Sequence, residues 1–180
     1  DVTMMDAYYL GRDLHQLTAD EGGVSRDAGK TFNFAKVFGA SDHQLSKKTG
    51  IALAKIPAIR QGWDRLYPQA AQWISNQYNN HGDYAVSDFG RRMSLPKNTT
   101  NINPRKFEAH VGKCAVNYPI QGTAADIIKR AMLKVKDYDL RLQVHDELVF
   151  DGEVELSEEL AHIHPEIHTP FNTYQEPKWK

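Results

Sequence analysis

Apolar side chains recur at intervals of three and four residues through much of the first 80 residues, and this spacing restricts that part of the chain to amphipathic helices. The recurring positions are Met5, Tyr8 and Tyr9, then Phe32, Phe34 and Val37, and then Ile56, Ile59, Trp63, Leu66 and Tyr67. Gly22 and Gly23 interrupt the pattern, and Ser25 stands where the N-cap of a helix beginning at Arg26 would stand.

The pattern changes after Gly82. Residues 84–96 are rich in strand-forming side chains and are broken by Gly90, which predicts a hairpin followed by a loop over residues 98–104. Helical spacing returns between Ile120 and Val135, and residues 140–150 favour strands again. Helices first and a mixed strand region afterwards predict an α+β fold.

The composition excludes several classes of protein. The chain has 180 residues, 41% hydrophobic and 25% charged, as expected for one packed unit or two small ones sharing a core. A single cysteine, Cys114, can form no internal disulfide, so we expect a reducing compartment. No run approaches the roughly 20 apolar residues of a membrane helix, and the start is unlike a signal peptide. We therefore expect neither secretion nor a membrane span.

The charge is distributed unevenly along the chain. The net charge is −1, but residues 26–136 carry eighteen basic and seven acidic side chains, whereas residues 137–180 carry three and eleven. A basic middle region suits a polyanion, because lysine and arginine displace the counterions of nucleic acids. Solvated helical faces are the alternative explanation of the same charges.

The segment from Ser25 to Gly39 is the most informative. In one helix Arg26, Lys30, Phe34 and Phe38 follow one another at steps of four, each turning by about 40° and advancing about 6 Å. Two cations followed by two rings match the phosphates and the base of a nucleoside triphosphate. The alternative is an amphipathic helix with core phenylalanines and solvated cations. Gly29 costs such a helix about 1 kcal/mol relative to alanine, so its backbone is expected to approach another group closely.

A second segment carries acidic residues. His145, Asp146 and Glu147 interrupt the apolar run of residues 140–150. Burying an unpaired carboxylate costs several kcal/mol of folding free energy. A hairpin tip in water or a divalent cation would satisfy them. The absence of glycine and asparagine from this tripeptide argues against the tight turn.

Other polar residues could bind a ligand. Asn117 and Gln121 would share a face if a helix continues across Pro119, and Arg91 and Arg92 follow Gly90 at a turn from which they could reach a phosphate backbone. Helix capping and a solvated turn are the ordinary alternatives.

Two further groups of side chains are interpreted as structural. Zinc is disfavoured at the cluster of His162, His164, Glu166 and His168, because Pro165 breaks the face that helical ligands would share. The aromatic residues of the helical half are expected to pack between helices, namely Trp63, Tyr67, Trp73 and Tyr78.

Several of these segments resemble, in order, those of the family A DNA polymerases, the type of bacterial DNA polymerase I. Residues 26–39 resemble the fingers-helix motif Arg-x3-Lys-x3-Phe-x3-Tyr-Gly, with Phe38 replacing the tyrosine, and residues 142–148 resemble the palm motif with a catalytic aspartate. Residues 11–19, 89–92 and 117–126 are similar to intervening segments.

The resemblance implies roles by matching position. Arg26 and His15 would contact the outer phosphates of an incoming deoxynucleotide and Lys30 the inner ones, and Lys30, Asp146 and Glu147 would form the catalytic set. Phe34 would lie against the sugar and base, and Phe38 near the templating base. Asp146 would hold Mg²⁺ with Glu147 beside it. The expected DNA contacts come from Arg91, Arg92, Asn117, Gln121 and His145.

The resemblance also implies an incomplete right-hand polymerase. Residues 1–80 would form the fingers and residues 81–180 the remainder of the palm, with antiparallel strands and without the N-terminal half. Asp1 and Asp6 do not stand in the family's other metal-binding context, Asp-Tyr-Ser-Gln-Ile-Glu. We expect an upstream half, in cis or in trans, to be needed for primer extension on primer-template DNA.

Two alternatives remain open. The chain could be a nucleic-acid-binding subunit that does not catalyse, or a relative of the single-subunit RNA polymerases. The expected location is the cytoplasm of a bacterium or a phage-infected cell, with an organelle as the alternative.

Overall fold

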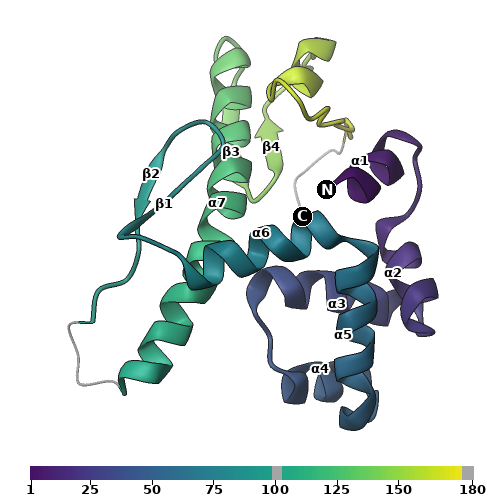
Figure 1. The fold of residues 1–180 in the computed structure, drawn as a ribbon. Helices are drawn as coiled ribbons and strands as arrows, with labels where there is room; N and C mark the ends of the chain where they lie inside the picture. The colour runs from purple at the N-terminus through teal and green to yellow at the C-terminus, as the bar shows by residue number, and fades with distance from the viewer. Residues whose placement is uncertain (99–102, 176–180) are drawn as a thin grey trace. The chain divides into compact units, whose positions relative to one another are not determined.

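The computed structural model describes residues 1–98 and 103–175. Residues 1–86 and 92–119 form one compact unit, and residues 87–91 together with those from Ile120 onward form a second (Figure 1). This division concerns packing, and the predicted boundary between fingers and palm near residue 80 stays a prediction.

Most of the first unit is helical, as the spacing of apolar residues predicts. Its helices are α1 (Val2–Tyr9), α2 (Leu14–Gly22), α3 (Arg26–Phe38), α4 (Asp42–Thr49), α5 (Ile56–Leu66) and α6 (Pro68–Asn79), with a 3-10 turn at Leu53–Lys55 before α5. The predicted cap of α3 is confirmed, because Ser25 Oγ accepts a hydrogen bond from the N–H of Ala28. Gly39 ends α3 in the left-handed conformation at φ 64°.

The core of these helices is small and apolar. Its buried members are Phe32, Ala35, Leu45, Ile56 and Ile59, with Val24, Ala40 and Ile51 packed against them. Phe32 and Ala35 lie three positions apart and turn one face of α3 inward. The residues on the remaining surface of α3 therefore do not belong to this core.

Gly29 brings α3 into backbone contact with α2. A Cβ atom at this position would lie 2.4 Å from the carbonyl oxygen of His15 and 2.9 Å from the amide nitrogen of Ala19. The expectation that glycine here permits a close approach is confirmed, and the neighbour is α2. His15 is thereby fixed beside α3.

A hairpin and the start of a long helix complete the first unit. Strands β1 (Tyr84–Val86) and β2 (Arg92–Ser94) pair antiparallel, and Gly90 in their connection has φ 82°, as the predicted hairpin requires. Ala85 and Leu95 are buried against Val111, Cys114 and Ala115 of α7 (Pro104–Lys134). Helix α7 continues across Pro119. Residues 99–102 of the predicted loop lie outside the described residues.

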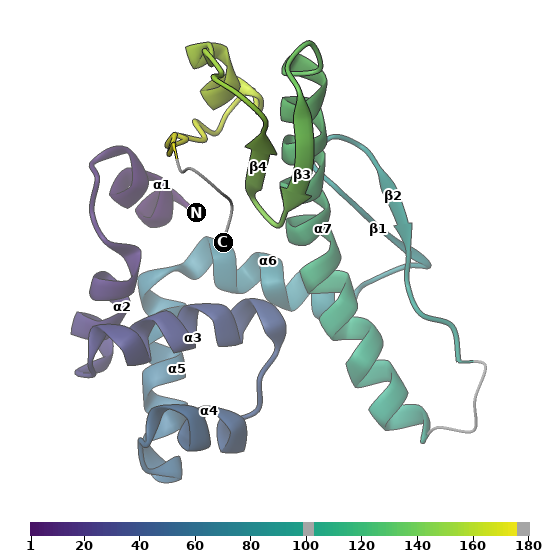
Figure 2. The same ribbon diagram turned by 180° about the vertical axis from the view of Figure 1, so that it is seen from behind.

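The second unit holds the later part of α7 and a second hairpin. Strands β3 (Leu140–Val144) and β4 (Glu147–Phe150) pair antiparallel, as Figure 2 shows from behind, and a 3-10 turn follows at Glu158–His162. Val135, Ala161 and Ile163 are buried. Tyr138 donates its hydroxyl hydrogen to the carbonyl oxygen of Glu155 over 2.6 Å. Helices with two small antiparallel sheets confirm the α+β class.

No helix in the part of the chain that the structure describes combines the length and the apolar character that crossing a bilayer would take.

Substitution of Gly29 by alanine tests the helix contact. Gly29→Ala should lower the free energy of unfolding by about 1–2 kcal/mol, because the clash with rigid backbone outweighs a propensity gain of about 1 kcal/mol. Urea denaturation measures this change. Gly62→Ala in α5 is the matched control, because its Cβ would meet the ends of two flexible side chains, Glu21 at 3.2 Å and Arg65 at 3.7 Å, and not backbone. A Gly29→Ala protein as stable as the Gly62→Ala protein would contradict the tight contact.

Candidate functional site

The exposed face of α3 carries the predicted stripe. Arg26, Lys30, Phe34 and Phe38 are all exposed, and the two rings keep 49% and 48% of their surface accessible. Of the phenylalanines in this helix only Phe32 enters the core, at 1% exposure. The interpretation of Phe34 and Phe38 as core residues is therefore wrong, because Phe32 and Ala35 occupy the inward face.

Aromatic rings lie next to one another along the stripe. Phe34 and Phe38 are stacked, with ring centroids 6.1 Å apart and planes 25° apart. The imidazole of His15, from α2, has its centroid 6.1 Å from that of Phe34. The structure thus brings His15 together with the rings of α3, whereas the binding of a nucleotide by these residues stays a prediction.

Arg26 is held beside α2 by an acidic residue. Its Nε lies 2.5 Å from Oδ2 of Asp13, and the other carboxylate oxygen of Asp13 caps α2 by accepting from the N–H groups of His15 and Gln16. The pKa of Asp13 is lowered, mainly by the hydrogen bond from Arg26 and further by the two capping bonds. Burial acts in the opposite direction, but its effect is smaller than that of Arg26. Arg26 and His15 are therefore positioned around one carboxylate.

A polar network that sequence reasoning missed lies beneath the stripe. Asn33 contacts His15, Thr18 and Trp63 through hydrogen bonds of 2.7–2.9 Å. In the sequence Asn33 stands out only as an amide between two phenylalanines of an amphipathic helix. Its hydrogen-bond partners lie 15–30 residues away along the chain, so the sequence pattern does not reveal them. Tyr67 joins the network through Thr18, and burial raises the pKa of Tyr67.

The predicted aromatic packing is confirmed in part. Trp63 and Tyr67 are buried and meet edge to face at 5.1 Å. Tyr78 packs on Gly112 of α7, where a Cβ would lie 2.9 Å from the ring. Trp73 keeps 37% of its surface exposed, so it is not enclosed between helices.

The acidic segment forms the tip of the β3–β4 hairpin. Val144 pairs with Glu147, which leaves His145 and Asp146 as a two-residue turn, and His145 has φ 51°. The carboxylates of Asp146 and Glu147 are exposed. The argument against a tight turn was wrong because His145 adopts the left-handed conformation that glycine or asparagine usually supplies. Water can solvate these carboxylates, so the fold itself requires no cation there.

The oxygen donors of this tip suit a hard cation such as Mg²⁺. Within residues 1–98 and 103–175, however, no three histidine, cysteine or acidic side chains come together as a potential metal site. Asp146 and its neighbour Glu147 could thus supply only part of a ligand set. In the histidine cluster, His164 is buried, its Nε2 lies 2.6 Å from Asp88, and its Nδ1 accepts two backbone N–H bonds, so it has a structural role.

Arg91 is tied to a buried carboxylate. Its Nε lies 2.7 Å from Asp126, which also accepts a 2.6 Å hydrogen bond from Ser87. Burial raises the pKa of Asp126, but the hydrogen bonds from Ser87 and Arg91 and the nearby cations outweigh it, so the pKa is lowered overall. The contact of Arg91 with DNA stays a prediction.

The other predicted DNA contacts lie on β2 and α7. Arg92 covers the Tyr84 ring at 4.1 Å and donates to its hydroxyl. Gln121 is exposed, whereas Asn117 is half-buried, and its Nδ2 has no hydrogen-bond partner among the described residues. Because α7 is continuous across Pro119, these two amides can share a face, as the prediction required.

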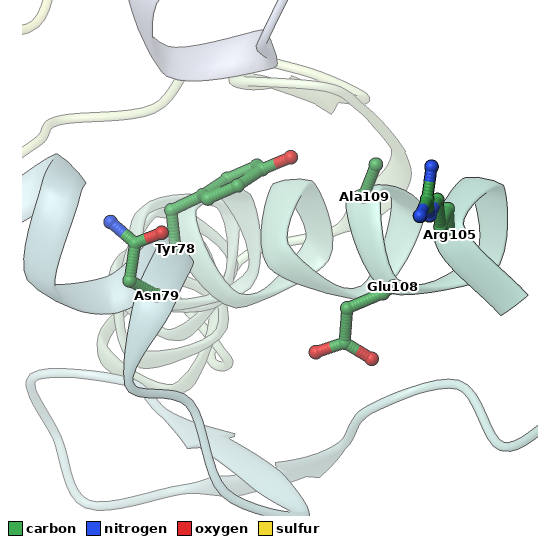
Figure 3. A pocket seen from close by; sticks show the side chains of 5 residues that line it. All are labelled: Tyr78, Asn79, Arg105, Glu108 and Ala109. Carbon is green, nitrogen blue, oxygen red and sulfur yellow. The ribbon is translucent and has the colours of Figure 1, made fainter.

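A cavity of about 370 Å³ lies between α6 and α7 in the first unit (Figure 3). It is lined by Tyr78, Asn79, Arg105, Glu108 and Ala109, and the close-up shows Tyr78 and Ala109 on the side of α7 opposite to Glu108. It contains none of the predicted site residues.

Comparison with known proteins identifies the family. The sequence model described as DNA polymerase family A matches residues 1–173. The chain belongs to DNA polymerase family A. The thermostable DNA polymerase I of Thermus aquaticus is 32% identical over 184 residues, which cover 93% of this chain and 22% of that protein. DNA polymerase I of Deinococcus radiodurans is 34% identical and covers 89% and 18%, and the DNA polymerase of Mycobacterium phage L5 is 31% identical and covers 83% and 24%.

A solved polymerase-domain structure has a similar fold. The POL domain of Pol1 from M. smegmatis, in complex with DNA primer-template and dNTP, matches with a TM-score of 0.69 and 29% identity over 91% of this chain and 32% of that one. This chain thus spans about a fifth to a quarter of the length of the full polymerases named above. The family resemblance of the motifs is confirmed, and the roles of single residues stay predictions.

The lowered pKa of Asp126 predicts a dependence of stability on pH. A carboxyl group with a lower pKa in the folded state stabilises the fold above its unfolded pKa of about 3.9, and this contribution is lost as the pH falls through the folded value. Asp126→Asn should therefore be less stable at neutral pH by about 2 kcal/mol and should lose less stability on acidification. Urea denaturation at pH values from about 7 down to 2.5 measures both effects. Asp137→Asn, at an exposed carboxylate of the same unit, is the control, and equal pH profiles would contradict the assignment.

Proposed function

We propose that this chain is the nucleotide-binding and primer-binding part of a family A DNA polymerase, which adds deoxynucleotides to a primer 3′ end on a DNA template. The observation that carries the proposal is the exposed stripe of α3, where two cations and two stacked rings follow at steps of four residues. A helix that served packing alone would bury its rings, and these remain half exposed.

In this proposal the two ends of the incoming nucleotide meet different parts of the stripe. Arg26 can fork onto outer phosphate oxygens, His15 can donate to the same phosphates, and Lys30 acts as a point charge on the inner ones. Phe34 offers its face to the sugar and base, and Phe38 extends this surface toward the templating base. Steps of about 6 Å along the helix give these contacts a length on the scale of a nucleoside triphosphate.

Asp146 would hold Mg²⁺, with Glu147 beside it. Two bound Mg²⁺ ions would supply charge that activates the primer hydroxyl and steadies the departing pyrophosphate. The exposure of both carboxylates at a hairpin tip supports this role. His145 has a left-handed backbone conformation, which costs a residue other than glycine conformational energy. Such strained residues cluster at functional sites, which supports a functional role for this tip.

The DNA would be contacted by Arg91, Arg92, Asn117, Gln121 and His145. The excess of basic residues over positions 26–136 supports a polyanionic partner. The solved relative from M. smegmatis is a complex with primer-template DNA and dNTP, which supports the same partners here. In this proposal residues 1–80 form the fingers and residues 81–180 belong to the palm.

We further propose that the 180-residue chain needs an upstream polymerase half, in cis or in trans. Asp146 and Glu147 supply too few carboxylates to hold two ions. Asp1 is already used, because its carboxylate accepts from the N–H groups of Met4, Gln69 and Ala70 and so caps α1 and α6. The relatives named above come from bacteria and a phage, which supports the cytoplasm of such cells as the location.

Nucleotide binding tests the stripe directly. Lys30→Ala should weaken binding of dATP in the presence of Mg²⁺ by about ten- to hundred-fold, because a hydrogen-bonded cation at a phosphate is worth roughly 1.5–3 kcal/mol. Isothermal titration calorimetry measures the affinity. Lys48→Ala removes the same charge from an exposed position of α4 and should leave binding unchanged. Equal losses in both variants would show that net charge alone attracts the nucleotide.

Primer extension tests the incompleteness of the chain. The 180-residue chain with Mg²⁺ should extend a primer poorly or not at all, and addition of an upstream polymerase half should restore synthesis that Asp146→Ala abolishes. Robust synthesis by the chain alone would refute the requirement. DNA binding that survives Asp146→Ala without activity in any reconstitution would favour a non-catalytic subunit, and a preference for ribonucleotides would favour an RNA polymerase relative.

A further inference from the structure

We propose that Asn33 is a positioning residue: held by Trp63, it fixes the imidazole of His15 in the tautomer that carries its proton on Nε2. The purpose of this arrangement, which is to aim an N–H donor at a triphosphate, rests on the proposed function. The tautomer itself follows from contacts within α2, α3 and α5.

The indole of Trp63 determines which way the amide of Asn33 points. An indole N–H can only donate a hydrogen bond, so the atom of Asn33 that it meets must be the carbonyl oxygen. Trp63 Nε1 lies 2.7 Å from Oδ1 of Asn33, and Thr18 Oγ1 lies 2.8 Å from the same oxygen. Trp63 and Thr18 are each 2% exposed, so water does not compete for these bonds.

The NH₂ group of Asn33 must therefore face the other way, toward α2. Nδ2 lies 2.9 Å from Nδ1 of His15 and 3.3 Å from the carbonyl oxygen of Leu14. An amide nitrogen can only donate, so Nδ1 of His15 has to accept and cannot carry a proton. In a neutral imidazole the proton then lies on Nε2.

This tautomer matters at a phosphate. Phosphate oxygens of a nucleotide are acceptors, so Nε2–H attracts them, whereas the opposite tautomer would present a lone pair to an anion. The ring is also held in place, because it packs against Phe34 and its backbone lies against Gly29. Trp63 and Asn33 thus act on the nucleotide only through His15.

The tautomer can be read without any nucleotide. Long-range ¹H–¹⁵N NMR spectra of the 180-residue chain at about pH 8.5 distinguish a protonated from an unprotonated nitrogen in each histidine ring. The expected result for His15 is an unprotonated Nδ1 and a protonated Nε2. In Asn33→Asp the new carboxylate oxygen can only accept, so the proton should move to Nδ1. A protonated Nδ1 in the wild type, or an unchanged tautomer in Asn33→Asp, would overturn the inference.

A second pair of variants tests the part of Trp63. Trp63→Phe removes the shortest of the bonds that orient the amide and leaves only Thr18 and the carbonyl oxygen of Leu14 to hold it, so the tautomer with its proton on Nδ1 should become detectable at His15. Trp73→Phe makes the same change at a partly exposed indole of α6 and should leave the His15 spectrum unchanged. A pure Nε2–H tautomer in Trp63→Phe would show that Trp63 does not orient Asn33.

A double-mutant cycle links the tautomer to binding. Asn33→Asp should weaken dATP–Mg²⁺ binding about ten-fold more in the presence of His15 than in a His15→Ala background, at a pH where the spectra show the variant imidazole to be neutral. Repulsion by the new carboxylate itself is common to both backgrounds and cancels. Equal penalties would overturn the positioning role. If the wild-type chain has the expected tautomer but binds no dATP, the proposed function fails while the tautomer assignment stands.

Discussion

The contact between α2 and α3 at Gly29 is the constraint on which the candidate site depends. At this point the backbones meet without a side chain between them, because a Cβ atom would lie 2.4 Å from the carbonyl oxygen of His15. The close approach brings His15 to the ring of Phe34 and Asp13 to the guanidinium of Arg26. A wider separation would leave the four side chains of the stripe on one helix without the donor from the other.

Helix α3 divides its surface between two tasks. Ala28, Phe32 and Ala35 supply the inward face, and small residues among them let the neighbouring helices come near. The outward face keeps Arg26, Lys30 and two phenylalanine rings in the open. Asn33 lies between the two faces, where its amide joins a buried indole to a half-exposed imidazole. The buried and the exposed face of α3 are thereby linked through a single polar side chain.

The second unit relies on a different interaction. Asp126 is buried and receives hydrogen bonds from Ser87 and Arg91, which fasten the β1–β2 connection to α7. The β3–β4 tip, in contrast, leaves Asp146 and Glu147 in solvent and places His145 in a left-handed conformation. One carboxylate thus stabilises the fold, while the two at the tip remain accessible to a cation.

The sequence by itself determined the helical first half, the hairpin over residues 84–96, the cap Ser25, the stripe and the family, because these features depend on neighbours within a few positions. It also located Gly29 as a point of close approach. Only the tertiary structure decided that Phe32 is core while Phe34 and Phe38 are not, since periodicity gives the spacing of residues on a helix and not which face is covered. The partners of Asn33, Arg26 and Asp126 lie 13–39 residues away along the chain, so their bonds exist only once the helices are packed.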